Sequence, residues 1–280
     1  MSSSRPQAKK SPELSAVIIT YNEEENIRDC IVSVHDWTDE VVVLDSHSTD
    51  RTARIAKSFP GVRFFTHDFD GHIQQKNRAI ELSRGRWVFC LDADERATPK
   101  LAASVREFIN KNPDAPGARV SRLTRHMGRF IRHGGWYNAR YRLLRRGAGV
   151  WGGENPHDQI FIHGQSPWRA AMARPLPGDL IHYSFRDLSH QVDTVNKFSS
   201  IVAFTRASRG TRFSFWKLLF KPLGKFIEIY FFKLGFLDGV PGLVIAVVSA
   251  HSAFLKNAKL HELQSGEIER PSNLRPDYKP

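Results

Sequence analysis

Residues 87–97, WVFCLDADERA, join a buried strand to a group of carboxylates at its end. Trp87 to Leu91 are apolar, and Asp92, Asp94 and Glu95 follow almost at once. Residues two apart in extended chain point to the same side, so Asp92 and Asp94 should share one side while the alanine between them turns into the sheet. Charges buried this close together are costly unless a cation lies between them.

A hard divalent cation is the first candidate for that positive charge. Two carboxylates at a strand end suit Mg²⁺ or Mn²⁺, which keeps further coordination positions for phosphate oxygens. The simpler alternative is that Asp92, Asp94 and Glu95 only supply negative charge near the start of a helix that begins at Thr98.

Strands and helices alternate on both sides of this stretch. Continuous apolar runs predict strands, and cap residues with 3.6-residue periodicity predict helices. Asn22, with Glu25 three residues later, is expected to cap the first helix, and Gly85 is expected to end the third as C′. The predicted strands are 14–20, 40–45, 62–69 and 86–91, and the later helices are 48–59, 72–85 and 98–112.

This alternation predicts an α/β fold with a doubly wound, mostly parallel sheet. Ligands of such sheets bind outside the carboxyl ends of the strands. Polar residues follow three of those ends, at 20–23, 45–46 and 92–94. The first turn, YNEEEN, carries three glutamates that would repel a pyrophosphate, and the sequence has no G-x-G-x-x-G or P-loop motif. A dinucleotide-binding domain and a P-loop enzyme are therefore disfavoured.

The composition agrees with a globular protein that binds anions. The formal net charge is +12, and the two cysteines, Cys30 and Cys90, fit buried thiols in a reducing cytosol. Residues 1–12 lack the apolar core of a signal peptide and are expected to form a disordered tail. The apolar run 239–255 is shorter than the roughly 20 residues of a spanning helix, so no transmembrane segment is predicted.

Four motifs together resemble the family 2 inverting glycosyltransferases, and most closely the branch of lipopolysaccharide-core β-glucosyltransferases. The resemblance covers roughly residues 13–260, and the ordered combination is specific where any single motif is not. The motifs are VIITYNEEENI, VVVLDSHSTDRT, QKNRAIELSRGRWVFCLDADE and IRHGGWYNARYRLLRR. The resemblance implies a GT-A fold and divides the chain into a GT-A domain at 13–200 (nucleotide-sugar half 13–114, acceptor half 115–200), amphipathic aromatic-rich helices at 201–262 and a loose tail at 263–280.

The resemblance also implies a set of site residues. The D-x-D motif would place Asp92 toward the ribose or the metal and Asp94 on the Mg²⁺ or Mn²⁺ that bridges the diphosphate. The general base of the inverting transfer falls in NPHDQI, which indicates Asp158, with Glu154 as the alternative. The remaining donor-binding residues implied are Thr20, Tyr21, Asn22, Glu23, Asp45, Gln75 and Lys76.

Two positions depart from the family pattern. His47 replaces a usual glycine, which would accept a positive φ more readily. Asp158 replaces a usual glutamate and is one methylene shorter. A Q/R-x-x-R-W element, which marks processive members of the family, does not follow Asp158, so single transfer is expected.

Two basic regions remain. Between 115 and 153 there are nine arginines, which predict a site for a phosphorylated acceptor or the leaving diphosphate; a solvated strand face and nucleic-acid binding are the alternatives. Between 213 and 237, Lys217, Lys221 and Lys225 lie four apart on an aromatic-rich helix that Pro222 and Gly224 should break or kink. Such a helix can lie at a membrane interface or simply pack on the sheet domain.

We therefore expect a metal-dependent, non-processive transferase at the cytoplasmic side of a bacterial inner membrane, as a peripheral protein. Its donor would be a UDP-sugar, UDP-glucose first, and its acceptor a phosphorylated, lipid-linked glycan such as the lipopolysaccharide inner core. No nucleic-acid partner is expected. The alternatives are a transferase acting on a polyprenyl-phosphate or capsule precursor, and a non-catalytic basic adaptor of membranes or nucleic acid.

Overall fold

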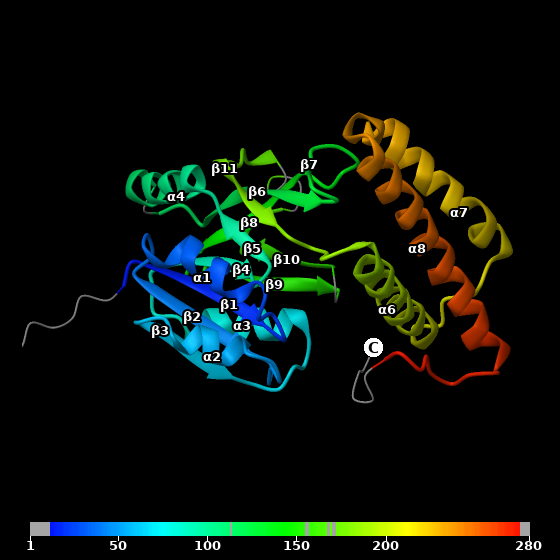
Figure 1. Ribbon diagram of the computed structural model, residues 1–280, viewed down its shortest axis with the longest axis horizontal. Coiled ribbons are helices and arrows are strands. Elements are labelled where there is room, and N and C mark those ends of the chain that lie inside the picture. The colour runs from blue at the N-terminus through cyan, green and yellow to red at the C-terminus, as the bar shows by residue number, and fades with distance from the viewer. Residues whose placement is uncertain (1–11, 113, 155–156, 167–168, 170–171, 275–280) are drawn as a thin grey trace, which may run out of the picture. The chain divides into compact units, whose positions relative to one another are not determined.

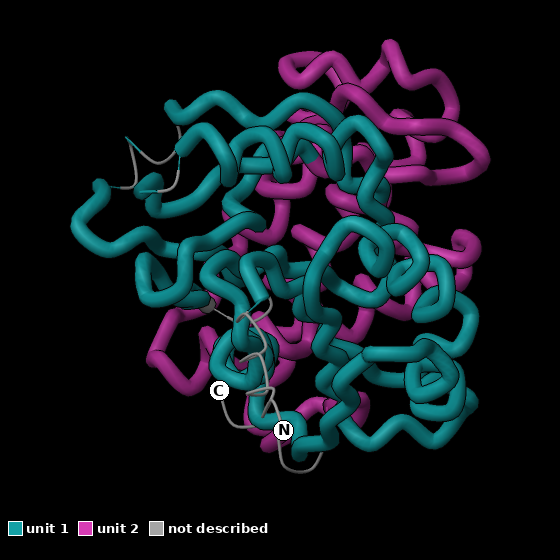
Figure 2. The backbone as a smooth tube through the Cα atoms, turned by 90° about the vertical axis from the view of Figure 1, so that its left-hand side faces the viewer, with its two compact units in different colours: residues 1–121, 139–181 teal, residues 122–138, 182–280 magenta. Residues whose placement is uncertain are grey.

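The computed structural model describes residues 12–112, 114–154, 157–166, 169 and 172–274 (Figure 1). The chain forms two compact units, which Figure 2 colours separately. Unit 1 consists of residues 1–121 and 139–181, and unit 2 consists of residues 122–138 and 182–280.

An extended sheet organises the first part of the chain. Within the described residues its strands follow the order β3-β2-β1-β4-β8-β6-β11-β5, with β7 paired to β6, and β9 and β10 form a separate hairpin. The strands are β1 (Leu14–Thr20), β2 (Glu40–Asp45), β3 (Val62–Thr66), β4 (Trp87–Asp92), β5 (Glu95–Ala97), β6 (Gly117–His126), β7 (Arg129–Ile131), β8 (Asn138–Arg145), β9 (Gly149–Glu154), β10 (His157–Ile162) and β11 (Leu176–His182).

The prediction of an α/β fold with parallel strands is confirmed for the first half of the chain. Strand β1 pairs in parallel with β2 and with β4, and β2 pairs in parallel with β3. Strand β8 runs antiparallel to β4, so the sheet becomes mixed beyond β4. The helices of unit 1 are α1 (Ile27–His35), α2 (Thr52–Lys57), α3 (His72–Leu82) and α4 (Pro99–Lys111).

Both faces of the parallel strands are buried, as their continuous apolar sequences predict. On one face, β1 residues such as Ala16 and Ile18 share a core with α1, α2 and α4. On the other face, Val17 and Val42 share a core with α3 and the β9–β10 hairpin. The sheet is therefore covered on both sides, which confirms the doubly wound arrangement.

Two predicted helix starts are wrong, for one physical reason. Helix α1 begins at Ile27 rather than after Asn22, and α2 begins at Thr52 rather than at 48. The cap-like side chains bond between the two loops instead: the Asn22 side-chain oxygen accepts from Thr49 N–H, and Thr52 Oγ1 accepts from Glu23 N–H. Such short polar side chains bond loop backbone as readily as helix ends.

Gly85 has a different role from the predicted helix cap. Helix α3 ends at Leu82, and its C-cap residue, Ser83, is extended. A Cβ at Gly85 would lie 2.6 Å from both the backbone nitrogen and Oγ of Ser15, so no larger residue fits. The glycine is required for close approach of this turn to β1. At the next helix the prediction holds, because the Thr98 side chain accepts from Leu101 N–H and Pro99 follows.

Unit 2 is mainly helical. Helix α7 continues without a break through Pro222 and Gly224, so the predicted break does not occur, and it runs on into five π-helical residues. A proline removes one backbone donor, and this helix tolerates that loss. The helical elements are α6 (Leu188–Ser208), α7 (Phe215–Ile227), η1 (Glu228–Phe232), η2 (Gly235–Asp238) and α8 (Val240–Ser265).

Close backbone packing and buried polar groups hold unit 2 together. A Cβ at Gly242 would overlap the carbonyl oxygen of Gly235, so α8 can approach η2 only with glycine there. Buried Asp238 accepts from the backbone N–H of His133 at 2.8 Å. Lys259 on α8 donates to Asn196 Oδ1 at 2.6 Å and to Ser200 Oγ at 2.7 Å on α6.

Helix α8 is also long and apolar. By length and composition it could cross a membrane, with a mean hydropathy of 1.3 in its most apolar window, of which 28% is buried inside the protein. It is longer than the uncharged run 239–255 because the helix continues to Ser265.

Candidate active site

The three polar strand ends lie side by side in unit 1. Thr20 of β1 pairs with Asp45 of β2, and Ile19 pairs with Asp92 of β4. Thr20, Asp45 and Asp92, three of the residues expected to bind the donor, therefore lie at the ends of adjacent strands at one edge of the sheet, as the parallel arrangement requires.

The first two loops are bonded into one surface beside that edge. Buried Asp45 accepts from the backbone of Ser48 at 2.8 Å and from its hydroxyl at 2.5 Å. The Ser48 hydroxyl in turn accepts from Asn22 N–H at 2.8 Å. Asn22 itself is exposed, as is Tyr21. Asp45 thus shapes the loop that faces the expected nucleoside position.

Backbone strain marks both loops. Asn22 has a φ of 53°, and His47 has a φ of 60°. A left-handed conformation costs an L-residue other than glycine roughly 1–2 kcal/mol. His47 therefore adopts a backbone conformation that glycine would accept more readily.

Thr20 presents a buried polar atom at the same edge. The residue is 5% exposed, and among the described residues its hydroxyl has no hydrogen-bond partner. Buried hydroxyl groups are nearly always bonded, so an orphan at a strand end is a feature that a bound ligand would explain.

Glu23 differs from the other acids of the edge. Burial raises the pKa of its carboxyl to about 7; the hydrogen bond from Asn26 opposes the rise, and the charge of Asp94 adds to it. Asn26 Nδ2 donates to Glu23 Oε2 at 2.7 Å. A carboxyl that titrates near neutrality is a feature often found at functional sites.

A carboxylate cluster surrounds the end of β4, and two cations compensate it. Arg142 Nη2 donates to Glu95 Oε1 at 2.6 Å and to Asp92 Oδ2 at 3.2 Å. Glu95 is fully buried, and its other oxygen accepts from Asp92 N–H at 3.0 Å. Against the opposing effect of burial, Glu95 and Asp92 raise the pKa of Arg142. Glu95 therefore binds an internal counter-ion and does more than support a helix start.

Lys76 connects this cluster to the predicted base. Its ammonium lies 3.0 Å from Asp92 Oδ1 and donates to Asp158 Oδ2 at 2.7 Å. Burial alone would lower the pKa of Lys76, but Asp92 and Asp158 outweigh it and raise the pKa. The ammonium also lies 4.4 Å from the ring centroid of Trp151. We use "carboxylate cluster" for Asp92, Glu95 and Asp158 with Lys76 and Arg142.

Gln75 and Asn77 flank Lys76 on α3 and hold the helix in place. Fully buried Gln75 donates to Ser46 Oγ at 2.9 Å, which ties it to the loop after β2. Asn77 exchanges two hydrogen bonds with the backbone of Trp151, at 2.9 and 3.0 Å. Gln75 is therefore a support of the site in this conformation, beneath the position expected for the donor.

The residues present suit a divalent cation that arrives with a diphosphate. Asp94 is half-buried and follows Asp92 by two residues, with buried Ala93 turned into the core as expected. The described residues contain no group of three or more His, Cys, Asp or Glu able to hold a metal by itself. Two hard carboxylates with coordination positions left for phosphate oxygens are what Mg²⁺ or Mn²⁺ accepts.

The two candidate bases, Asp158 and Glu154, both belong to the β9–β10 hairpin. Asp158 pairs with Gly153 across the β9–β10 hairpin, and its side chain is 8% exposed. In the described part of the chain, only its Oδ2 is engaged, by Lys76. Glu154 ends β9, but its side chain lies outside the described residues.

The nine arginines of the segment 115–153 divide between the two units, and several of them bond the protein itself. Arg119 donates to the carbonyl of Ala139, Arg146 to that of Gly85, and Arg142 belongs to the carboxylate cluster. This role of Arg142 was not among the predictions from the sequence. Its signal was the placement of an arginine within the apolar strand sequence YRLL, where a buried acid must compensate it.

Comparisons with known proteins give a family. The profile of the family described as glycosyl transferase family 2 matches residues 15–160. A lipopolysaccharide core biosynthesis glycosyltransferase, LpsC of Rhizobium meliloti, is 31% identical over 89% of this chain and 92% of its own length. An uncharacterised glycosyltransferase of Rickettsia typhi is 29% identical over 89% of this chain and 87% of its own length.

Solved structures give a weaker likeness. Glucosyl-3-phosphoglycerate synthase from Mycobacterium tuberculosis, in complex with Mn²⁺, UDP and glucosyl-3-phosphoglycerate, is 24% identical over 41% of this chain and 44% of its own chain. The TM-score is 0.33. A score this low does not establish a common fold over the whole chain, and those ligands are properties of the mycobacterial enzyme.

Proposed function

The chain belongs to glycosyl transferase family 2 and is a glycosyltransferase, and we propose that it catalyses one inverting, metal-dependent sugar transfer to a lipid-linked glycan. The donor is a UDP-sugar, UDP-glucose in the first place, and the acceptor is a phosphorylated glycan such as the lipopolysaccharide inner core. The name of LpsC supports the acceptor class, since the two chains align over most of their lengths.

One observation carries the assignment of the site. A single ammonium, that of Lys76, contacts both Asp92 of the D-x-D motif and Asp158, the predicted base, although 66 residues separate the two acids in sequence. Donor diphosphate and acceptor hydroxyl must meet within a few ångströms in an inverting displacement. The pairing brings the residues proposed for these two partners to one place.

The proposed transfer needs one proton acceptor. Asp158 takes the proton of the acceptor hydroxyl while the hydroxyl oxygen bonds to the anomeric carbon, and the bond from that carbon to the diphosphate oxygen breaks. Lys76 holds Asp158 through Oδ2, and among the contacts of the described residues Oδ1 is left to receive the proton. Asp94 and Asp92 would hold a divalent cation, which offsets charge on the leaving nucleoside diphosphate. Thr20, Tyr21, Asn22, Glu23 and Asp45 line the proposed nucleoside position.

The test separates donor binding from the base. Thermal stability of the full chain is measured with UDP, GDP, ADP and CMP, each with and without Mn²⁺. We expect only UDP with Mn²⁺ to stabilise, by roughly 2.7 kcal/mol at about 100 times its dissociation constant. Asp94→Asn should abolish this shift, whereas Asp158→Asn should keep it.

Transfer rates complete the test. Asp158→Asn should lower the rate by roughly 10²–10⁴-fold, the usual contribution of a general base. Glu154→Gln is the matched control and should keep most of the rate. If the two variants exchange these outcomes, Glu154 is the base. A chain that no nucleotide stabilises would reject the donor-site assignment.

The acceptor and the location are tested in cells. We propose that the enzyme works as a peripheral protein on the cytoplasmic side of the inner membrane, supported by the exposed apolar side chains of α7 and α8. Faster-migrating lipid A–core in a deletion strain would support the lipopolysaccharide acceptor, and unchanged core would favour a polyprenyl-phosphate or capsule precursor. Full release into the soluble fraction at low salt would contradict the membrane location.

A further inference from the structure

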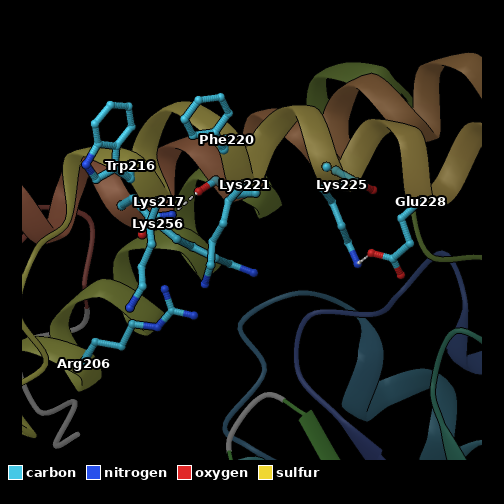
Figure 3. Close-up of a pocket in the computed structure, with 12 residues that line it drawn as sticks. Arg206, Trp216, Lys217, Phe220, Lys221, Lys225, Glu228 and Lys256 are labelled. Carbon is cyan, nitrogen blue, oxygen red and sulfur yellow. Dashed lines mark hydrogen bonds and ion pairs between the residues drawn. The ribbon is translucent and has the colours of Figure 1, made fainter.

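Unit 2 contains a cavity of its own. It has a volume of about 750 Å³ and lies among α6, α7, η1 and α8. That volume is within the roughly 300–1,000 Å³ of small-molecule sites. Its charged and aromatic lining residues, which Figure 3 labels, are Arg206, Trp216, Lys217, Phe220, Lys221, Lys225, Glu228 and Lys256.

The lining of this basic pocket is strongly positive. Five basic side chains line it against one carboxylate, Glu228. That carboxylate already accepts from Lys225 at 3.0 Å and from Lys233 at 2.5 Å. Arg206, Lys217, Lys221 and Lys256 make no ion pair with any acid in the part of the chain that the structure describes.

Neighbouring positive charges lower the pKa of two lysines of the pocket. Burial lowers the pKa of Lys256, and the charges of Arg206, Lys225 and Lys221 lower it further. Burial also lowers the pKa of Lys221, with Arg206 and Lys217 adding to the effect. Like charges held together in a partly buried site are unfavourable until an anion neutralises them.

The pocket is also lined by exposed aromatic rings, which add an apolar surface to its basic one. Trp216 and Phe220 stack with centroids 5.7 Å apart and an interplanar angle of 15°, yet they are 66% and 55% exposed. Figure 3 shows these rings on one side of α7 and the ends of Lys217, Lys221 and Lys225 on the other. Leu219 and Leu223 of the same helix are more than half exposed. A ligand that satisfied both sides would be amphiphilic.

We propose that the basic pocket binds the phosphate group of an anionic membrane lipid, with the lipid's apolar part against Trp216, Phe220 and the neighbouring leucines of α7. The charge complementarity selects a phosphate, since ammonium groups bind phosphate oxygens as point charges. The exposed apolar side chains select a lipid-borne phosphate over a free one, because basic amphipathic helices bind anionic membranes through both features.

The test uses the full chain and sedimentation with vesicles. Binding to phosphatidylcholine vesicles is compared with binding to vesicles that also contain phosphatidylglycerol. We expect the protein to sediment with the vesicles that contain phosphatidylglycerol and not with vesicles of phosphatidylcholine alone. Lys221→Gln with Lys256→Gln should weaken this binding about thirtyfold, since each basic residue near an anionic surface contributes roughly fivefold.

A matched control removes the same charge elsewhere in unit 2. Lys197 and Arg212 are exposed and do not line the pocket. Lys197→Gln with Arg212→Gln should change binding less than threefold; an equal loss in both double variants would show a diffuse charge effect and overturn the proposal.

The source of the phosphate is tested separately. Trp216→Ala should weaken vesicle binding while leaving any binding of inorganic pyrophosphate, measured by calorimetry, unchanged. Tight pyrophosphate binding with no preference for anionic vesicles would overturn the lipid proposal in favour of a soluble phosphate. The UDP-dependent thermal shift should survive in the pocket variants, so this proposal and the proposed catalytic function can fail independently.

Discussion

The carboxylate cluster of unit 1 and the basic pocket of unit 2 differ in how far their charges are paired within the protein. In the cluster, Lys76 and Arg142 lie within 3.2 Å of the acids they compensate, and Glu95 is fully buried. In the pocket, five basic groups face one carboxylate. Most of the charge in the cluster is compensated by groups of the protein itself, whereas the pocket gains most when an external anion enters. Internal compensation indicates a pre-organised site, and its absence indicates a site that depends on its ligand.

Breaking the internal compensation should have the largest effect. Arg142→Met leaves Glu95 buried without its counter-ion, and such a loss costs roughly 3–5 kcal/mol. Urea unfolding of the two proteins measures the difference. Arg145→Met is the control, because its partner Asp114 is 90% exposed, and exposed pairs contribute about 1 kcal/mol at most. Equal losses in both variants would mean that the cluster is not internally compensated.

Glu23 is an acid of unit 1 whose charge is not compensated in the way that the charges of the cluster are. Among the described residues it forms no ion pair. Its folded pKa of about 7 exceeds the ordinary value of 4.5, so the folded protein binds the proton more tightly. Stability should therefore be greatest below pH 4.5 from this group and fall as pH rises toward 7, by about 3 kcal/mol at most. Glu23→Gln should remove this dependence in unfolding measurements across pH 4–8.

The exposed neighbour Glu25 gives the control for this pH effect. Glu25→Gln should keep the wild-type slope of stability against pH. A Glu23→Gln protein with the same slope as wild type would show that burial does not perturb this carboxyl.

Two lysines of α8 make the smallest test. Lys259→Met removes the hydrogen bonds to Asn196 and Ser200 and should cost roughly 1–3 kcal/mol. Lys256→Met removes a like-charge contact and should stabilise by about 0.5 kcal/mol at low salt, with the gain vanishing at high salt. Thermal unfolding at two salt concentrations measures both. A destabilising Lys256→Met at low salt would contradict the uncompensated charge of the pocket.

Local sequence predicted the regular part of unit 1 well. The strands 14–20 and 40–45 have the predicted bounds, because runs such as EVVVLD bury both faces and leave no alternative. The contacts of the loops were harder to predict from local sequence. Asn22, Ser48 and Thr52 all have good helix-capping side chains, but each bonds a loop that is distant in sequence. Sequence alone does not show which of two partners such a side chain takes.

In the candidate site too, one part could be predicted from the sequence and another could not. The adjacency of Thr20, Asp45 and Asp92 followed from the parallel sheet, because neighbouring strand ends must meet. The contact of Lys76 with Asp158 depends on how the β9–β10 hairpin packs on α3, which no local pattern encodes. The catalytic roles of these residues remain predictions until the variants are measured.

The burial of both cysteines has a practical consequence for labelling. Cys30 and Cys90 are free and buried, and burial raises the pKa of Cys90 to about 11 and that of Cys30 still further. At neutral pH the thiolate, the form that reacts with maleimides, is therefore disfavoured at both cysteines. A cysteine introduced at an exposed position would therefore carry the sole reactive thiol of this chain. Two such positions would accept a pair of fluorophores without labelling of the native cysteines.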